Sequence, residues 1–319
     1  MSITVSVVIP AYNAGEYLGR AIDSVLAQTR PAEEIIVVDD GSADNTADVA
    51  QGYGDKIRFI RQENAGASVA RNTGIEAATS EWIAFLDADD EWLAQKLELQ
   101  TEHLRRNPEL VWTTGNFIRC FCDTDRREND LKGERLIKAK AILGKKEYFK
   151  TYFHAYQAYA TGCTDTILVK RDALFAAGLF APGQLRINDY DMWLRVAYSM
   201  SPLGCITEPL AVAHRDVPGS IVKRYRDPEI ISAFIERHLD LARNKGAFDE
   251  FKPCAARMLG WWIHVFLTEK RGRVVRDILR RFGHLYSPYY RTTTFIKSWF
   301  PGPGLWHDQF KEGIRKHRD

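Results

Sequence analysis

A short apolar run at the start of WIAFLDADD (Trp82–Asp90) is followed by three aspartates within four residues. Two similar runs precede it in the chain: TVSVVIP (Thr4–Pro10) leads into Tyr12–Asn13, and EIIVV (Glu34–Val38) leads into Asp39–Asp40. Short β-branched runs of this kind are typical of strands buried on both faces of a parallel sheet. Polar side chains therefore follow directly where each of these three predicted strands ends.

Helical patterns lie between and after these strands. Ser42 is predicted to be the N-cap of a helix that reaches Ala50, and the other expected elements are helices over Gly15–Gln28, Ser68–Ala78 and Leu93–Arg106 and a strand over Ile57–Ile60. This alternation predicts an α/β fold with a mostly parallel, Rossmann-like central sheet flanked by helices. Ligands of such sheets bind beyond the carboxyl ends of the strands, where the polar clusters fall.

The pattern is looser after Leu110. Three features are expected there before the tail, namely a strand over Leu110–Phe117, a charged surface excursion over Asp123–Lys146 and a strand over Thr166–Val169. Beyond Asp227–Pro228, helical periodicity dominates to Phe282. Pro288, Pro301 and Pro303 are then predicted to break the end into short pieces. We therefore predict two domains, a nucleotide-sugar-binding domain over residues 1–225 and a helical extension over residues 226–319.

Composition indicates a folded protein with unevenly distributed charge. The 319 residues are 45% hydrophobic and 27% charged, with a formal net charge of +2, which excludes disordered and fibrous classes. Residues 252–319 carry a net charge of +9, so residues 1–251 carry −7. Half of the eight tryptophans also lie in the basic segment. This asymmetry indicates either two separate functions for the two segments or one function carried out beside an anionic surface.

Several features predict a cytoplasmic protein. No apolar run approaches the ~18–20 residues of a membrane-spanning helix, and Met1–Val5 does not begin a secretory signal. The five cysteines form no Cys-x-x-Cys pair, which suits a reducing compartment.

The aspartates at the end of the fourth strand admit two interpretations. Asp87, Asp89 and Asp90 could hold a divalent cation such as Mg²⁺ or Mn²⁺ that shares a substrate's phosphates, or they could form a solvated turn with a helix cap. Asp39–Ser42 is likewise either a turn that binds a nucleoside or an ordinary strand-to-helix turn. The chain has neither a GxGxxG fingerprint nor a P-loop, which argues against dinucleotide binding and P-loop ATP hydrolysis.

Four motifs, taken together, resemble those of family 2 glycosyltransferases. They are VSVVIPAYNAGEYLGRAIDSVLAQT (Val5–Thr29), EIIVVDDGSADNT (Glu34–Thr46), ENAGASVARNTGIEAA (Glu63–Ala78) and WIAFLDADDEW (Trp82–Trp92). A later segment, NDYDMWLRVA (Asn188–Ala197), is similar to the acidic catalytic segment of that family. The resemblance extends over residues 4–224. It implies a GT-A fold and an inverting, metal-dependent glycosyltransferase.

The resemblance also implies roles for individual residues. Asp40 would pair with the pyrimidine ring of the donor, Arg71 would lie near the base, and the loop packing on the base would be Pro10, Ala11, Tyr12 and Asn13. Asp87, Ala88 and Asp89 match the family's DxD motif. In that motif Asp87 would face the ribose, and Asp89, together with Asp87, would hold Mn²⁺ or Mg²⁺ on the diphosphate.

The expected general base is Asp189, which matches the aspartate of the family's Glu-Asp pair. The chain departs from the family here, because Asn188 stands where glutamate is usual and an amide cannot titrate. Asp191 is the alternative base, although it also suits the N-cap of a helix over Met192–Ala197.

A second departure concerns the family's metal-binding histidine, whose position is occupied by Val217. His214, three residues earlier, is either a replacement metal ligand or a structural residue.

In the tail, Arg271–Tyr286 places apolar residues on one helical face and arginines on the other. This pattern predicts either an interfacial helix on anionic lipid, with Trp299 and Trp306 as anchors, or a helix docked within the protein. The chain is thus expected to transfer a sugar from a nucleotide-diphosphate donor, most simply a UDP-sugar, to a glycan or lipid-linked acceptor. Surface polysaccharide assembly on the inner face of the membrane is the expected setting, with no nucleic acid involved. Two alternatives remain, a non-catalytic sugar-nucleotide-binding scaffold and a sugar-phosphate nucleotidyltransferase.

Overall fold

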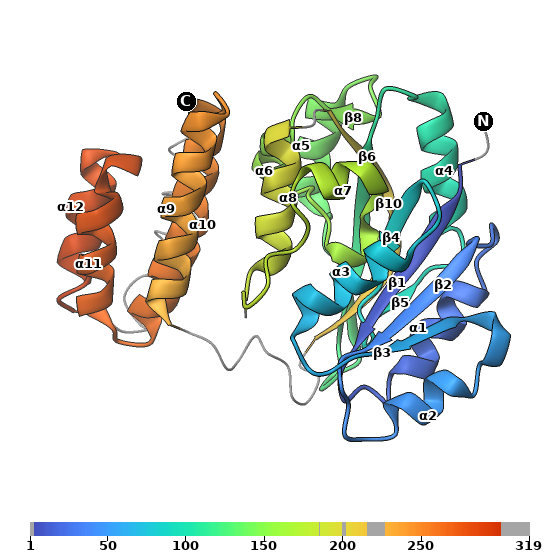
Figure 1. The fold of residues 1–319 in the computed structure, drawn as a ribbon. Coiled ribbons are helices and arrows are strands. Elements are labelled where there is room, and N and C mark those ends of the chain that lie inside the picture. The colour runs from blue at the N-terminus through green and yellow to red at the C-terminus, as the bar shows by residue number, and fades with distance from the viewer. Residues whose placement is uncertain (1–2, 185, 200–201, 216–226, 301–319) are drawn as a thin grey trace. The chain divides into compact units, whose positions relative to one another are not determined.

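The chain forms two compact units, Met1–Tyr225 and Arg226–Asp319 (Figure 1). The structure is a computed structural model that describes residues 3–184, 186–199, 202–215 and 227–300. None of the described helices has the length and apolar character needed to cross a bilayer.

The first unit is built on one ten-stranded sheet, and its amino-terminal half is parallel. The order of the main path is β3-β2-β1-β4-β9-β6-β10-β5, and the first four strands in it all pair in parallel. Their bounds are β1 Val5–Ala11, β2 Glu34–Asp39, β3 Arg58–Arg61 and β4 Trp82–Phe85. This half confirms the sequence prediction, because each strand reaches the next through a local helical crossover.

The other half of the sheet is mixed, so the expectation of a mostly parallel sheet holds only for the first half. Strand β9 runs antiparallel to both β4 and β6, whereas β10 pairs in parallel with β6. The shorter strands at this end, β5, β7 and β8, all pair antiparallel. The bounds are β5 Glu91–Trp92, β6 Trp112–Phe121, β7 Arg126–Asn129, β8 Tyr148–Phe149, β9 Leu168–Lys170 and β10 Leu203–Arg215.

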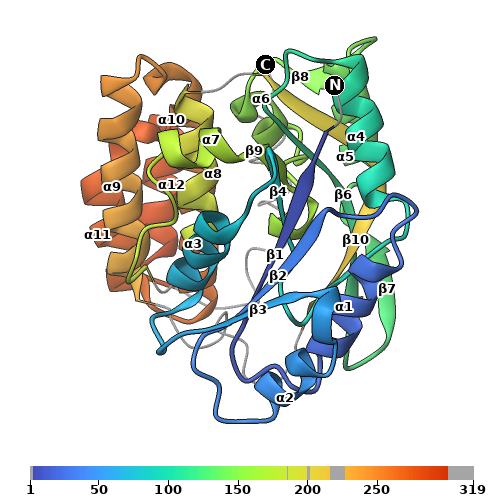
Figure 2. The ribbon, with the colours of Figure 1, turned by 45° about the vertical axis from the view of Figure 1, so that its right-hand side comes forward.

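Helices cover both faces of the sheet (Figure 2). Val7 and Ile9 of β1 pack with the apolar face of α1, while Val8 between them faces α3. At Gly74 of α3 an added Cβ would lie 2.3 Å from Val8, so glycine allows the helix to approach the strand. The helices of this unit are α1 Leu18–Leu26, α2 Thr46–Gln51, α3 Ala67–Ala77, α4 Lys96–Arg106, α5 Gly133–Leu143, α6 Tyr152–Gln157, α7 Arg171–Ala176 and α8 Asn188–Ser199.

One of three local predictions was wrong. The α2 helix begins after Asn45 rather than after Ser42, whose hydroxyl instead accepts the backbone N–H of Asn13 at 2.9 Å. The charged excursion Asp123–Lys146 is mostly exposed, as expected, and it contains β7 and α5; β7 pairs with β6 and so lies at the sheet edge. The predicted interruption at Pro288 is also found, because α11 (Gly272–Phe282) ends before it and Pro288 stands in the first turn of the separate helix α12 (Pro288–Lys297), where its missing N–H costs no hydrogen bond. Pro301 and Pro303 lie outside the described residues.

The second unit consists of helices α9 Pro228–Asn244, α10 Phe248–Thr268, α11 Gly272–Phe282 and α12 Pro288–Lys297. The apolar face of α11 is buried inside this unit through Val275, Ile278, Leu279 and Phe282. Of the two interpretations of α11, the structure therefore supports the docked helix.

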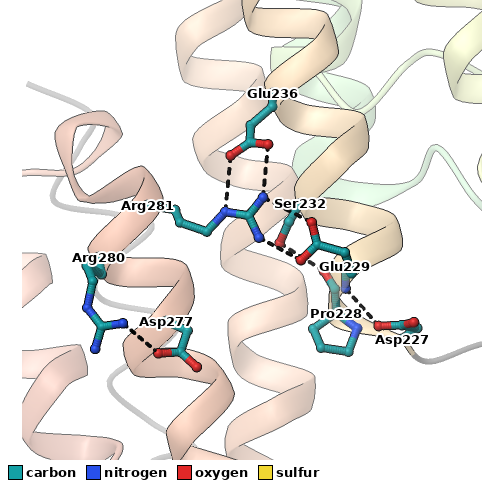
Figure 3. Close-up of polar contacts among 8 residues, drawn as sticks. All are labelled: Asp227, Pro228, Glu229, Ser232, Glu236, Asp277, Arg280 and Arg281. Atoms are coloured by element: carbon teal, nitrogen blue, oxygen red, sulfur yellow. Dashed lines mark hydrogen bonds and ion pairs between the residues drawn. The ribbon is translucent and has the colours of Figure 1, made fainter.

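One guanidinium joins α11 to α9. Arg281 donates to both carboxylate oxygens of Glu229, at 2.6 and 3.0 Å, and to both of Glu236, at 3.1 and 2.9 Å (Figure 3). Asp227 caps the start of α9 by accepting the N–H of Glu229 at 2.9 Å. We call Glu229, Glu236 and Arg281 the ionic clamp.

Candidate functional site

The loop after β1 is held by the loop after β2. Asn13 adopts a left-handed conformation, with φ of 48°, and its side-chain oxygen accepts the N–H of Ala43 at 2.8 Å. The N–H of Asp40 donates to the carbonyl of Ala11 at 2.8 Å. Tyr12 stands out from this loop with 54% of its surface exposed. The loop thus presents one free aromatic ring on a rigid backbone, next to the half-buried Pro10.

Asp40 is buried and organises the turn before α3. One of its carboxylate oxygens accepts the N–H of Ala65 at 2.9 Å and an amide N–H of Gln62 at 2.8 Å, and the other accepts the N–H of Gly66 at 2.8 Å. Gly41 beside it has φ of +74° and lies so close to Asn64 that a Cβ would clash. The turn is therefore specified by both residues.

Three carboxylates converge where β4 ends. Asp87, Asp90 and Asp165 each offer an oxygen within 4.8 Å of the others, and we call these three residues the acidic cluster. Asp165 accepts the backbone N–H of Asp87 at 2.8 Å and is hydrogen-bonded to the Asp90 carboxyl group. Burial raises the pKa of Asp90 well above its usual value, and the charge of Asp165 raises it further. Clustered oxygen donors of this kind suit a hard divalent cation such as Mg²⁺ or Mn²⁺.

Asp89 borders the acidic cluster. Burial, followed by the negative charges of Asp87 and Asp165, raises the pKa of Asp89 to about 6. Its backbone carbonyl accepts a hydrogen bond from Arg20 at 2.6 Å, which fixes the turn from outside. A divalent cation would relieve the repulsion that raises this pKa, so the donor chemistry of the residues fits such an ion. Ala88 between the two DxD aspartates is buried.

Arg71 of α3 connects several parts of the site. It donates to Asp87 at 2.6 Å, and its guanidinium carbon lies 5.4 Å from the centre of the Phe180 ring. The charges of Asp87, Asp189 and Asp165 all raise the pKa of Arg71 against the lowering effect of burial. The structure thus brings Arg71 near to the carboxylates at the strand end and at the start of α8.

Helix α3 is the common neighbour of the predicted site residues. The turn leading into it is bonded to Asp40, its first turn contacts Asn188 through Ser68 at 3.3 Å, and its second turn contacts Asp87 through Arg71. Residues separated by about 150 positions in the sequence therefore meet around one helix start.

Asp189 and Asp191 differ in their surroundings. Burial raises the pKa of Asp189, and Asp87 adds to this, whereas Arg71 and the N–H of Tyr190 oppose it. Asp191 is 1% exposed in its side chain and is paired with Arg195 at 2.7 Å. It lies inside the first turn of α8, which begins at Asn188, so its predicted role as an N-cap was wrong. Asp189 thus combines a raised pKa with electrostatic contact to Asp87 of the DxD motif, whereas Asp191 forms an ion pair with Arg195.

The ring of His214 is directed to other partners. Its Nε2 lies 3.1 Å from Glu91 and its Nδ1 lies 3.7 Å from the sulfur of Cys122, while its backbone N–H donates to Asp90 at 2.6 Å. Burial lowers the pKa of His214. Metal ligation by His214 stays a prediction, and Val217 lies outside the described residues.

Two residues of the site carried no usable sequence signal. Asp165 stands in a 3₁₀ turn, Thr164–Thr166, and reaches the acidic cluster because β9 pairs with β4. Lys96, the first residue of α4, is completely buried; burial lowers its pKa to about 7, against the opposing charge of Asp165.

Comparisons with known proteins identify the family of the chain. A model of the family described as "Glycosyl transferase family 2" matches residues 6–175. The chain is similar to UDP-Glc:alpha-D-GlcNAc-diphosphoundecaprenol beta-1,3-glucosyltransferase WfgD of Escherichia coli, with 41% identity over 244 residues that cover 74% of this chain and 88% of WfgD. It is also similar to the uncharacterized glycosyltransferase YibD of Escherichia coli K12, with 38% identity over 44% of this chain and 41% of YibD. Like YibD, several other curated relatives are matched over less than two thirds of their length.

A solved structure shares the fold. The crystal structure of residues 1–349 of Staphylococcus aureus TarS in complex with UDP-GlcNAc matches with a TM-score of 0.61 and 17% identity, covering 93% of this chain and 89% of that one. The central sheet with its flanking helices is therefore a GT-A fold, as the sequence predicts.

Proposed function

The chain belongs to glycosyl transferase family 2, and from this premise we propose that it moves a sugar from a nucleotide-diphosphate donor to a hydroxyl of a glycan or lipid-linked acceptor, inverting the anomeric carbon. The observation that carries the proposal is the meeting of Asp40, Asp87 and Asp189 around the start of α3. A scaffold protein would not need a half-buried carboxylate of raised pKa at this position.

For the donor we propose a uridine nucleotide, bound by the loop Pro10–Asn13 and by the turn that Asp40 holds. The exposed ring of Tyr12 is available for stacking on a base. Support also comes from WfgD, which is named for UDP-Glc, and from TarS, which was crystallised with UDP-GlcNAc.

For the metal site we propose Mn²⁺ or Mg²⁺, held by Asp89 and Asp87. The other two residues of the acidic cluster, Asp90 and Asp165, lie next to these ligands, and His214 is a further candidate ligand. Once bound, the ion supplies positive charge that stabilises the leaving diphosphate. Arg71 orients Asp87 through their 2.6 Å hydrogen bond, so the DxD turn keeps one arrangement.

For the chemical step we propose that Asp189 is the general base. Its carboxylate accepts the proton of the acceptor hydroxyl as the acceptor oxygen bonds to the anomeric carbon, and the bond from that carbon to the phosphate oxygen breaks. A raised pKa makes Asp189 a better proton acceptor than an ordinary aspartate. The salt bridge of Asp191 to Arg195 makes it the weaker candidate for the base.

We further propose that the acceptor is lipid-linked and that the second unit contacts an anionic membrane surface. WfgD is named for an acceptor carrying diphosphoundecaprenol. We assign the contact to α12 and the two residues described after Ser298, rather than to α11, because Tyr289, Ile296, Trp299 and Phe300 are each more than half exposed. These side chains lie in the segment whose net charge is +9, and aromatic rings beside basic groups suit a headgroup layer. Trp306 lies outside the described residues.

The test of activity is a panel of UDP-, dTDP- and GDP-sugars incubated with Mn²⁺, with release of the nucleoside diphosphate measured by mass spectrometry. We expect turnover with one uridine donor and a fall in turnover of about 10³ after Asp189→Asn. Binding of a donor without any turnover, by the wild type and with acceptor glycolipids present, would instead support the scaffold alternative.

The test of the membrane contact is co-sedimentation with vesicles that contain anionic or only zwitterionic lipids. We expect binding to anionic vesicles at low salt and weaker binding after Trp299→Ala. Absence of binding to anionic vesicles at low salt would end this part of the proposal and leave the transfer chemistry untouched.

A further inference from the structure

Lys96 is an unusual residue because its charge is buried without a hydrogen-bond partner. The side chain has no exposed surface, and its Nζ has no acceptor among the described residues. The Nζ lies 3.7 Å from the centre of the Trp92 ring, so a cation–π contact is the nearest compensation. An isolated ammonium in such a place is strongly destabilising unless an opposite charge lies nearby.

That opposite charge comes from Asp165. Gln100, one turn after Lys96 on α4, donates to the carbonyl of Thr166 at 2.8 Å, which brings α4 against the 3₁₀ turn that holds Asp165. The Asp165 carboxylate interacts electrostatically with Lys96, and Asp165 is itself only 2% exposed. Arg71 also interacts electrostatically with Asp165, but its hydrogen bond goes to Asp87, and Arg20 donates to the carbonyl of Asp89. Asp165 is repelled by the charge of Asp87, whereas Asp90 is hydrogen-bonded to it, so the Lys96 charge opposes the Asp87 repulsion from the side of α4.

Asp165 in turn holds the DxD turn. It accepts the backbone N–H of Asp87 at 2.8 Å, directly after the last residues of β4. It also accepts from the thiol of Cys163 at 3.3 Å. The Asp165 carboxylate therefore connects the buried ammonium of Lys96 to the backbone of Asp87, where the DxD turn begins.

We propose that Lys96 is a positioning residue of the nucleotide-sugar site: its ammonium compensates the buried Asp165 carboxylate, which fixes the backbone of Asp87 and so the direction of the Asp87–Ala88–Asp89 turn. This inference takes its ligand, a nucleotide-sugar, from the proposed function, whereas the Lys96–Asp165 charge pair does not depend on that proposal. Lys96 does not touch the donor and acts only through Asp165.

The test compares Lys96→Met, Asp165→Asn and the double variant with the wild type, measuring the Mn²⁺-dependent affinity for UDP by calorimetry and the Tm. Lys170→Met is the matched control, because Lys170 also lies over a tryptophan, Trp82 at 5.5 Å, yet is half exposed and paired with Glu81. We expect Lys96→Met to weaken UDP binding about tenfold or more and Lys170→Met to leave it unchanged.

The double variant separates positioning from simple packing. If Lys96 acts through Asp165, the double variant binds UDP as Asp165→Asn alone does, and its Tm is no lower than that of Lys96→Met. If Lys96→Met does not fold, the UDP affinity and Tm of the double variant are compared with those of Asp165→Asn, and equal values support the inference. Independent, additive losses in affinity, or unchanged affinity in Lys96→Met, would overturn the inference. If the wild type binds no UDP, the proposed function fails instead, while the Tm coupling still tests the charge pair.

Discussion

The two units arrange their charges in opposite ways. In the first unit the acidic cluster and Asp89 gather negative charge at a strand end, and the pKa values of Asp89, Asp90 and Asp165 are all raised. In the second unit the ionic clamp satisfies one guanidinium with four hydrogen bonds, and Glu229 and Glu236 raise the pKa of Arg281. The raised pKa values mean that ionisation of these carboxyl groups destabilises the folded protein. The first unit thus keeps neighbouring carboxyl groups that repel one another, whereas the second unit pairs its glutamates with an arginine.

The difference separates a binding site from a structural contact. Charged groups that are paired with one another, as in the ionic clamp, need no ligand and contribute to the packing of the helices. Charges that remain uncompensated point to a missing partner, here a cation that carries a diphosphate. Changes in the first unit should therefore affect chemistry and binding far more than stability, and changes in the clamp should do the reverse.

The largest expected effect is on catalysis by Asp189→Asn. Removing a general base costs roughly 10²–10⁴ in rate, so we expect kcat for sugar transfer to fall by about 10³ with little change in donor affinity. Steady-state kinetics with a saturating donor measures this. Asp191→Asn is the control for the base assignment; if it abolishes transfer while Asp189→Asn does not, the roles are reversed.

The next effect is a gain in stability from Asp89→Asn without metal. The folded-state pKa of Asp89, about 6, lies above the unfolded value of 3.8, so the folded protein favours the protonated carboxyl group. The contribution of Asp89 to the free energy of unfolding is therefore fully present below pH 3.8 and is lost as the pH rises through 6. Asparagine does not ionise, so at pH 7 the metal-free variant should be more stable by about 2 kcal/mol, a rise of a few degrees in Tm. Thermal unfolding with a chelator present checks this, and the gain should shrink toward pH 4. The same variant should lose Mn²⁺-dependent UDP binding, and equal or lower stability at pH 7 would contradict the account of the cluster.

A smaller effect is the pH dependence of metal binding by the wild type. Below about pH 6, Asp89 takes up a proton and competes with the cation. The affinity for Mn²⁺ in the presence of UDP should therefore fall about tenfold between pH 7 and pH 5, as measured by titration calorimetry. A flat profile over this range would show that Asp89 is not a ligand.

The smallest effect is expected in the ionic clamp. Arg281→Met leaves two half-exposed glutamates without a partner and should cost about 1 kcal/mol of stability, because the clamp is partly solvated. Chemical denaturation measures this loss. Donor hydrolysis by the same variant should be unchanged, and a large loss of hydrolysis would break the distinction between the two units.

The parallel half of the fold was predictable because its signals are local. Each of β1, β2 and β4 is a continuous apolar run followed by its own helix, and the polar residues after the runs mark the site edge. In the other half, the predictions of strands over Leu110–Phe117 and Thr166–Val169 are confirmed by β6 and β9, but the pairing of these two strands was not predicted, since it joins distant segments. Strand β10 was missed altogether: Pro209 interrupts its pattern, and the pairing with β6 shifts register on both sides of that residue.

The site was predictable to the same extent. Asp40, Asp87 and Asp89 follow strands with strong local patterns, whereas Asp165 precedes a three-residue strand in a stretch with no periodicity. Lys96 appeared to be an ordinary charged residue at a helix start, and only the packing of α4 against the sheet shows that it is buried. Long-range pairing thus supplied the residues that sequence patterns did not.

The central claim is that the acidic residues at the end of β4 bind a divalent cation together with a nucleoside diphosphate. Calorimetric titration of UDP into the wild-type protein, with and without Mn²⁺, tests it most directly. The account predicts one UDP per chain, bound tightly only when Mn²⁺ is present, and no such binding by Asp89→Ala. UDP binding of equal strength with and without the metal, or retained in full by Asp89→Ala, would contradict it.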